Sequence, residues 1–142
     1  MSILEVREVR KTYTTRLGSN RVEALRNVSF SVEQGEYVAI MGESGSGKTT
    51  LLNILASLDK ATSGQVLLKG RDLSEIRRRD ICTFRREHMG FVFQDFNLLD
   101  TLTTSENIAL ALTINKIPAG EIDGRVREMA GKLNITDILD KY

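Results

Sequence analysis

Residues 42–50 have the types and spacing of a phosphate-binding loop. Gly42, Gly47, Lys48 and Thr49 satisfy the pattern G-x-x-x-x-G-K-[S/T]. Glycines let the backbone curl with its N–H groups pointing inward, in conformations that a side chain would block. N–H donors at the start of a helix attract anions, and a lysine adds positive charge. The stretch therefore predicts a site for the phosphates of a nucleotide.

Each position of this loop has an expected role. Lys48 is predicted to reach the terminal phosphates as a catalytic group, Thr49 to bind Mg²⁺ through its hydroxyl, and Thr50 to contact the inner phosphate. The other positions are expected to contact the phosphates through the backbone: Gly42, Glu43, Ser44, Gly45, Ser46 and Gly47. The predicted ligand is thus a nucleotide with Mg²⁺.

The sequence on either side of the loop predicts the elements that such a site needs. Residues 37–41 ("YVAIM") are continuously apolar, which is typical of a strand buried on both faces. Apolar residues then recur at helical spacing over residues 51–58. Strand, glycine loop and helix in this order form the context that the motif requires. We therefore predict an α/β fold of the P-loop NTPase class.

The remaining chain predicts strands first and helices later. Alternation indicates an antiparallel sheet with one wet face over residues 3–9 and 28–32, and apolar runs predict a short strand at 66–69 and a second buried strand at 89–93. Residues 74–88 predict a surface helix. Thr103 and Glu106 form a capping box. It opens a helical region that is broken near Pro118 and near Asn134.

Composition excludes several classes of function. The 142 residues suit one domain, and a net charge of +1 gives no general attraction to nucleic acid or to anionic membranes. The arginines between residues 77 and 86 alternate with acidic residues, so a solvated helix face is the simpler interpretation. No apolar run approaches the roughly 18 residues of a membrane span. We expect a cytoplasmic protein that neither binds nucleic acid nor inserts into a membrane.

A phosphate loop alone does not separate GTPases, kinases and ATPases. A GTPase reads guanine with N-K-x-D. The nearest match is "NKIP" at residues 115–118, where Pro118 replaces the required aspartate. Guanine recognition is therefore excluded.

Two longer stretches resemble the ATP-binding subunit of ABC transporters. They are residues 9–74, which include "EALRNVSF" and "NILASLD", and residues 89–112, "MGFVFQDFNLLDTLTTSENIALAL". Their combination is most similar to lipoprotein-release exporters and to macrolide and antimicrobial-peptide exporters. The resemblance implies an ABC-type fold with three parts: an antiparallel β-subdomain, part of a central parallel sheet and the start of a helical subdomain. Residues 3–100 would form the antiparallel and P-loop core part, and residues 101–142 the beginning of the helical subdomain.

The resemblance also implies roles for three further residues. Tyr13 matches the aromatic residue that stacks on adenine, and a ring face suits any base. Val22 would line the other edge of the adenine. Gln94 matches the glutamine that approaches Mg²⁺ and the attacking water, so it is a predicted catalytic and metal-binding residue that also senses the membrane partner.

The resemblance implies further hydrolytic elements that the 142 residues lack. These are an Asp-Glu pair that ends an apolar strand, an "LSGGQ" loop and a late histidine, whereas His88 precedes Gln94. In the family these elements lie further along the chain. Such groups carry most of phosphoryl-transfer catalysis. We expect the complete domain to be an ATPase and these 142 residues to bind ATP but to hydrolyse it poorly or not at all.

The family also implies partners and a place of action. These are a transmembrane permease subunit, a head-to-tail homodimer of the complete protein and a peripheral position at the inner face of the membrane, where ATP use is coupled to export. Two alternatives stay open. One is a fragment that docks on a membrane partner without catalysis, and the other is a non-transport ABC ATPase that acts on DNA.

Overall fold

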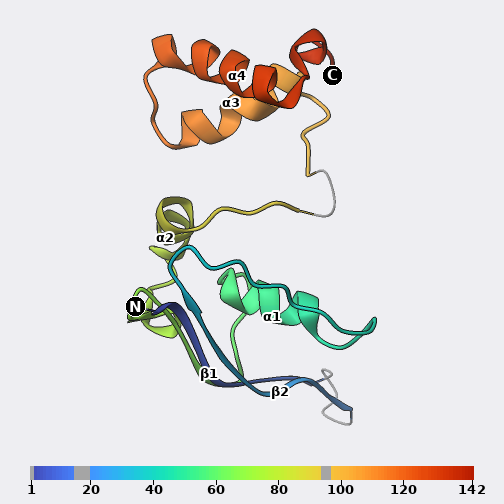
Figure 1. Cartoon of the computed structure of the whole chain (residues 1–142), viewed down its shortest axis with the longest axis vertical. Helices are drawn as coiled ribbons and strands as arrows, with labels where there is room; N and C mark the ends of the chain where they lie inside the picture. The colour runs from blue at the N-terminus through green and yellow to red at the C-terminus, as the bar shows by residue number, and fades with distance from the viewer. Residues whose placement is uncertain (1, 15–19, 94–96) are drawn as a thin grey trace. The chain divides into compact units, whose positions relative to one another are not determined.

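A computed structural model describes residues 2–14, 20–93 and 97–142 of the chain, drawn in Figure 1. The fold divides into two compact units, residues 1–90 and residues 91–142, and each is described by itself below. The first unit contains the sheet and the phosphate loop, and the second is helical.

An antiparallel sheet forms the base of the first unit. The described strands, in the spatial order β2-β1-β3-β4, are β1 (Ser2–Thr14), β2 (Arg21–Glu33), β3 (Ser63–Leu68) and β4 (Arg71–Asp72). The predicted antiparallel sheet is confirmed. β1 continues past residue 9 to Thr14 because its pairing with β2 extends to the end of the hairpin, where Tyr13 lies opposite Val22.

Helix α1 (Lys48–Leu55) packs on this sheet (Figure 1). Leu51 and Ile54 are its buried residues, at 5% and 4% exposure, as the helical spacing predicts. They share a core with four residues of the strands: Val6, Val9, Leu25 and Val66. Burial of an aliphatic side chain of this size stabilises a fold by about 1.5 to 3 kcal/mol. This core fixes α1 against β1, β2 and β3.

Two predicted strands are absent. Residues 37–41 and 89–93 have no regular structure, and Tyr37, Met41 and Val92 are among the most exposed apolar residues, at 94%, 88% and 103%. The expectation of two buried strands was wrong for these residues. A strand requires backbone partners, and all strand pairs that the described residues form are antiparallel. The predicted part of a central parallel sheet is therefore not formed within the described ranges.

The predicted surface helix over residues 74–88 is divided. It consists of a 3₁₀ turn (Leu73–Glu75) and helix α2 (Ile81–His88). Asp72 caps the 3₁₀ turn by accepting a hydrogen bond from the backbone N–H of Ser74 at 2.8 Å. Between the two helical pieces the chain turns so that Arg77 pairs with Asp80 at 2.8 Å. Part of the arginine-rich stretch is therefore neutralised by its own acidic neighbour.

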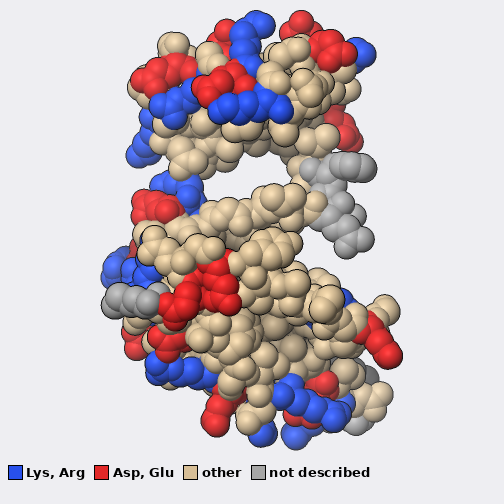
Figure 2. Space-filling view, in the orientation of Figure 1, with Lys and Arg blue, Asp and Glu red and all other residues tan. Residues whose placement is uncertain are grey.

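The second unit is a pair of helices, α3 (Thr104–Ile114) and α4 (Ala119–Leu133), followed by a 3₁₀ turn (Thr136–Ile138). Val126, Ala130 and Leu139 form its buried core, against which Ile108 and Leu112 pack. The predicted helix breaks are confirmed, since α4 begins after Pro118 and ends at Leu133, where Asn134 follows in a left-handed conformation. Figure 2 shows acidic and basic side chains interleaved over this unit. Three i,i+4 ion pairs join such side chains along α4.

The predicted capping box is confirmed at the start of α3. The Thr103 hydroxyl accepts from the backbone N–H of Glu106 at 3.2 Å, and the Glu106 carboxylate accepts from the backbone N–H of Thr103 at 2.7 Å. Two backbone donors at the helix start are thereby satisfied. Neither α3 nor any other helix in the described part of the chain is long and apolar enough to cross a membrane.

Thr103→Ala is expected to destabilise α3 locally by about 1 kcal/mol, because a backbone donor loses its cap. Hydrogen exchange of the amide protons of α3 measures this local opening. Thr113→Ala is the matched control. The Thr113 hydroxyl donates to the carbonyl of Ala109 within the same helix, at 3.0 Å. Its loss should change the free energy of local opening by less than about 0.5 kcal/mol. Equal effects of the two substitutions would contradict the capping role.

Candidate nucleotide site

The phosphate loop lies on the surface of the first unit and turns directly into α1. The backbone N–H of Ser46 donates to the carbonyl of Glu43 at 3.2 Å, which closes a turn. Gly47 then adopts a left-handed conformation, with φ 91°, and α1 begins at Lys48. The predicted loop-to-helix transition is therefore observed at the predicted residue.

The start of α1 has backbone donors that the described protein leaves unpaired. The N–H groups of residues 47–50 have no acceptor within the described ranges, and α1 has neither a side-chain cap nor an acidic residue in its first turn. Aligned peptide dipoles give such a helix end a partial positive charge. This end of α1 is thus suited to bind an anion, and phosphate is a common one.

Lys48 places its ammonium group within the curl of the loop. Its Nζ donates to the carbonyls of Gly42 and Glu43 at 2.7 and 2.6 Å, and to the Ser46 hydroxyl at 3.3 Å. All of these acceptors are uncharged. Phosphate oxygens would offer stronger, charge-assisted hydrogen bonds to the same ammonium group. The Lys48 ammonium is therefore located where it could donate hydrogen bonds to a phosphate bound by the loop.

Close packing against β2 fixes the end of the loop. A Cβ atom on Gly47 would lie 2.3 Å from the carbonyl oxygen of Ala24 and 2.9 Å from a methyl carbon of Leu25. Real Cβ contacts are not that short, so glycine is the residue that allows this approach. β2, which is far from the motif in sequence, therefore helps to position the phosphate loop.

Of the two residues predicted to bind Mg²⁺, Thr49 lies within the described residues. Thr49 is exposed on the first turn of α1, and its hydroxyl has no hydrogen-bond partner among the described residues. Gln94 lies outside the described residues. No group of three or more His, Cys, Asp or Glu residues that could hold a metal occurs in the described ranges. In loops of this pattern the Ser or Thr hydroxyl binds Mg²⁺ beside the substrate phosphates, and the exposed Thr49 hydroxyl fits such a site.

The two residues predicted to contact adenine are cross-strand neighbours. Tyr13 of β1 is paired with Val22 of β2. Directly paired residues of an antiparallel pair project from the same face of the sheet. Both side chains are open to solvent, with 44% and 61% exposure. The hairpin register therefore brings together two residues that the sequence separates by a loop.

A comparison with protein families agrees with this geometry. A family profile described as ABC transporter matches residues 25–142, which include the phosphate loop, α1 and both helices of the second unit. The chain belongs to the ABC transporter family.

Similar proteins include exporters of this family. The chain is 46% identical over its whole length to the bacitracin export ATP-binding protein BceA of Halalkalibacterium halodurans, of which it covers 55%. It is 38% identical to the macrolide export ATP-binding/permease protein MacB of Aggregatibacter actinomycetemcomitans, with 96% of this chain and 21% of MacB covered. The chain thus spans about half the length of the bacitracin exporter subunit. The predicted similarity to exporters of these kinds is confirmed.

Solved structures confirm the ABC-type P-loop fold. The ATP-binding cassette MJ0796, in a dimeric post-hydrolysis state bound to ADP and Pi, superposes with a TM-score of 0.87 at 35% identity. The match covers 96% of this chain and 60% of MJ0796. CbiO1 of Clostridium perfringens, part of the ABC transporter complex cbiONQ, gives a TM-score of 0.77 at 28% identity.

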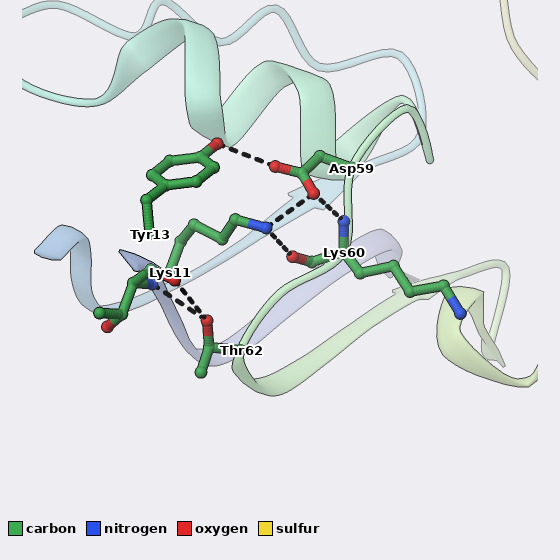
Figure 3. A network of polar contacts seen from close by, with 6 residues as sticks. Lys11, Tyr13, Asp59, Lys60 and Thr62 are labelled. Carbon is green, nitrogen blue, oxygen red and sulfur yellow. Dashed lines mark hydrogen bonds and ion pairs between the residues drawn. The ribbon is translucent and has the colours of Figure 1, made fainter. Parts of the chain in front are cut away.

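Sequence reasoning missed a polar cluster next to Tyr13 in this ABC transporter chain. The cluster consists of Lys11, Tyr13 and Asp59, and we call it the Asp59 cluster (Figure 3). The Asp59 carboxylate accepts from Lys11 Nζ at 2.7 Å and from the Tyr13 hydroxyl at 2.8 Å. Partial burial alone would raise the pKa of Asp59. The hydrogen bonds from Lys11, Tyr13 and the backbone of Lys60 outweigh this effect and lower the pKa below its usual value, so the carboxylate is charged at neutral pH.

Gly47→Ala is expected to destabilise the first unit by clearly more than Gly45→Ala. Both glycines have positive φ, 91° and 81°, so both alanines are strained by about 1 kcal/mol. Only at residue 47 would the added carbon also collide with β2, since a Cβ at Gly45 meets nothing within 4 Å. Urea unfolding of the two variants measures the difference. Equal destabilisation would show that the contact with Ala24 does not constrain the loop.

Proposed function

We propose that this chain supplies the part of an ABC transporter's ATP-binding subunit that contacts the phosphates and the adenine of ATP. The observation that carries the proposal is the phosphate loop itself. Its N–H donors at the start of α1 have no acceptor among the described residues, and the Lys48 ammonium donates to the carbonyls of Gly42 and Glu43. Membership of the ABC transporter family supports ATP as the nucleotide.

In this proposal the loop and the hairpin bind opposite ends of the nucleotide. Residues 42–50 contact the phosphates, with Lys48 on the terminal ones. Thr49 and Gln94 contribute to the Mg²⁺ site, and Mg²⁺ supplies charge neutralisation for the phosphates. Tyr13 stacks on the adenine, and Val22 lines its edge. The exposed ring of Tyr13 supports this role, since a base needs an accessible face for stacking.

We further propose that the whole protein works as an exporter ATPase. Residues 3–100 would belong to its core and residues 101–142 to its helical subdomain, with Lys48 and Gln94 among its catalytic groups. It would form a head-to-tail dimer, act with a transmembrane permease subunit and lie at the inner face of the membrane. The names of the bacitracin and macrolide export relatives and the dimeric state of MJ0796 support these assignments.

Lys48→Ala is expected to weaken MgATP binding by at least about tenfold, because a charge-assisted hydrogen bond to phosphate is lost. Isothermal titration calorimetry of the chain measures the affinity. Lys132→Ala is the control, since this lysine pairs with Glu128 on the solvent face of α4. A folded chain that does not bind MgATP would contradict the proposed function and favour a module that docks on a membrane partner without nucleotide.

The 142-residue chain is expected to release no phosphate from MgATP above the rate of a Lys48→Ala variant. The reason is that an Asp-Glu strand end, an "LSGGQ" loop and a late histidine are not in its sequence. Loss of a single electrostatic group commonly costs about 10² to 10³ in rate. A phosphate-release assay measures this turnover. Steady, Mg²⁺-dependent release that disappears in Lys48→Ala would contradict the expectation.

A further inference from the structure

We propose that Asp59 is a positioning residue that holds the ring of Tyr13 ready for the adenine base and connects it to the helix that follows the phosphate loop. The inference rests on the proposed ATP site. It assigns a role to a residue outside the phosphate loop and outside the hairpin.

The first observation is that Asp59 restrains an otherwise exposed ring. Tyr13 is 44% exposed near the end of β1, where a side chain can change rotamer readily. Its hydroxyl donates to Asp59 Oδ2 at 2.8 Å. A hydrogen bond at the tip of the ring restrains rotation about the Cα–Cβ bond, which would otherwise move the hydroxyl away from Asp59. Binding a base then requires less ordering of Tyr13, and preorganisation of this kind raises affinity.

The second observation is that Lys11 fixes the carboxylate. Its side chain is only 11% exposed, and its Nζ donates to Asp59 Oδ1 at 2.7 Å and to the carbonyl of Lys60 at 2.6 Å. The same ammonium lies 4.8 Å from the centroid of the Tyr13 ring, within the range of a cation–π contact. Lys11 therefore holds Asp59 in place and lies against one face of the ring (Figure 3). A stacking base would use the other face.

The third observation is that the backbone around Asp59 is tied to both elements. The N–H groups of Leu58 and Asp59 donate to the carbonyl of Asn53 in α1, at 2.8 and 3.1 Å. On the other side, Thr62 exchanges hydrogen bonds with β1, donating to the carbonyl of Arg10 at 2.8 Å and accepting from the N–H of Thr12 at 3.0 Å. Asp59 therefore has a fixed position relative to α1 and to the strand that carries Tyr13.

These contacts place a support for the base at one end of α1 and the phosphate loop at the other. The helix has eight residues, a length of about 12 Å at 1.5 Å per residue. Asp59 would thus affect recognition of the base and leave recognition of the phosphates to the loop. This separation gives the proposal its test.

Calorimetric titration with MgATP and with magnesium tripolyphosphate, which lacks a base, measures the two contributions separately. Asp59→Ala and Tyr13→Phe should each weaken MgATP binding by about three- to tenfold, the range of one hydrogen bond. Tripolyphosphate affinity should stay within about twofold. Asp59→Asn should lose less MgATP affinity than Asp59→Ala, because the asparagine amide oxygen can still accept a hydrogen bond from the Tyr13 hydroxyl. Asp123→Ala on α4, which removes a solvent-exposed partner of Arg127, is the matched control.

The double variant Tyr13→Phe with Asp59→Ala should bind MgATP no more weakly than the weaker single variant, because both substitutions remove the same contact. Additive losses would overturn the proposal. An Asp59→Ala variant that keeps full MgATP affinity would also overturn it. So would one that loses affinity for MgATP and for tripolyphosphate equally, since that result indicates a general structural role. If Asp59→Ala does not fold, Tyr13→Phe decides, because it removes only the hydroxyl. A wild-type chain that binds tripolyphosphate and MgATP equally well would refute the base contact while leaving the phosphate loop intact, and a chain that binds neither would refute the proposed function itself.

Discussion

The burial of Leu51 and Ile54 against the antiparallel sheet is the contact on which the candidate site depends. An isolated helix of eight residues is not stable in water, so α1 exists because its apolar face packs on Val6, Val9, Leu25 and Val66. The phosphate loop is exposed and forms few hydrogen bonds of its own. Its shape therefore follows from a helix that the sheet holds in place, and the anion-binding end of that helix is a product of tertiary packing.

Two lysines of the first unit differ in the acceptors of their ammonium groups, and this difference suits them to different roles. Lys48 donates to two carbonyls and a hydroxyl, all uncharged. The Lys11 side chain is only 11% exposed and donates to a carboxylate. Exchange of the neutral acceptors of Lys48 for phosphate oxygens would strengthen its hydrogen bonds, whereas the removal of Lys11 from Asp59 would leave a partly buried carboxylate without its cation. The first lysine is thus suited to engage a ligand and the second to maintain a site.

Local patterns predicted the elements that local interactions stabilise. The phosphate motif, the capping box at Thr103 and the helix stop at Asn134 each depend on residues within a few positions of one another. The apolar run of residues 37–41 predicted burial, but an apolar run does not specify which strand will pair with it. The described residues form no parallel partner, and the run stays irregular and exposed except at Ile40, which packs against the core. The hydrogen bond from Tyr13 to Asp59 joins residues 46 positions apart, and no spacing rule in the sequence indicates it.

The contact between Gly47 and the carbonyl of Ala24 has a consequence for how the motif would change over evolutionary time. Packing of the first unit requires glycine at this position whether or not a nucleotide is bound. A descendant that no longer used ATP would be released from selection on the ammonium of residue 48 and the hydroxyl of residue 49, but not from selection on this glycine. In divergent copies of this domain, the lysine would therefore be a marker of retained activity, whereas Gly47 would be a marker of the retained fold alone.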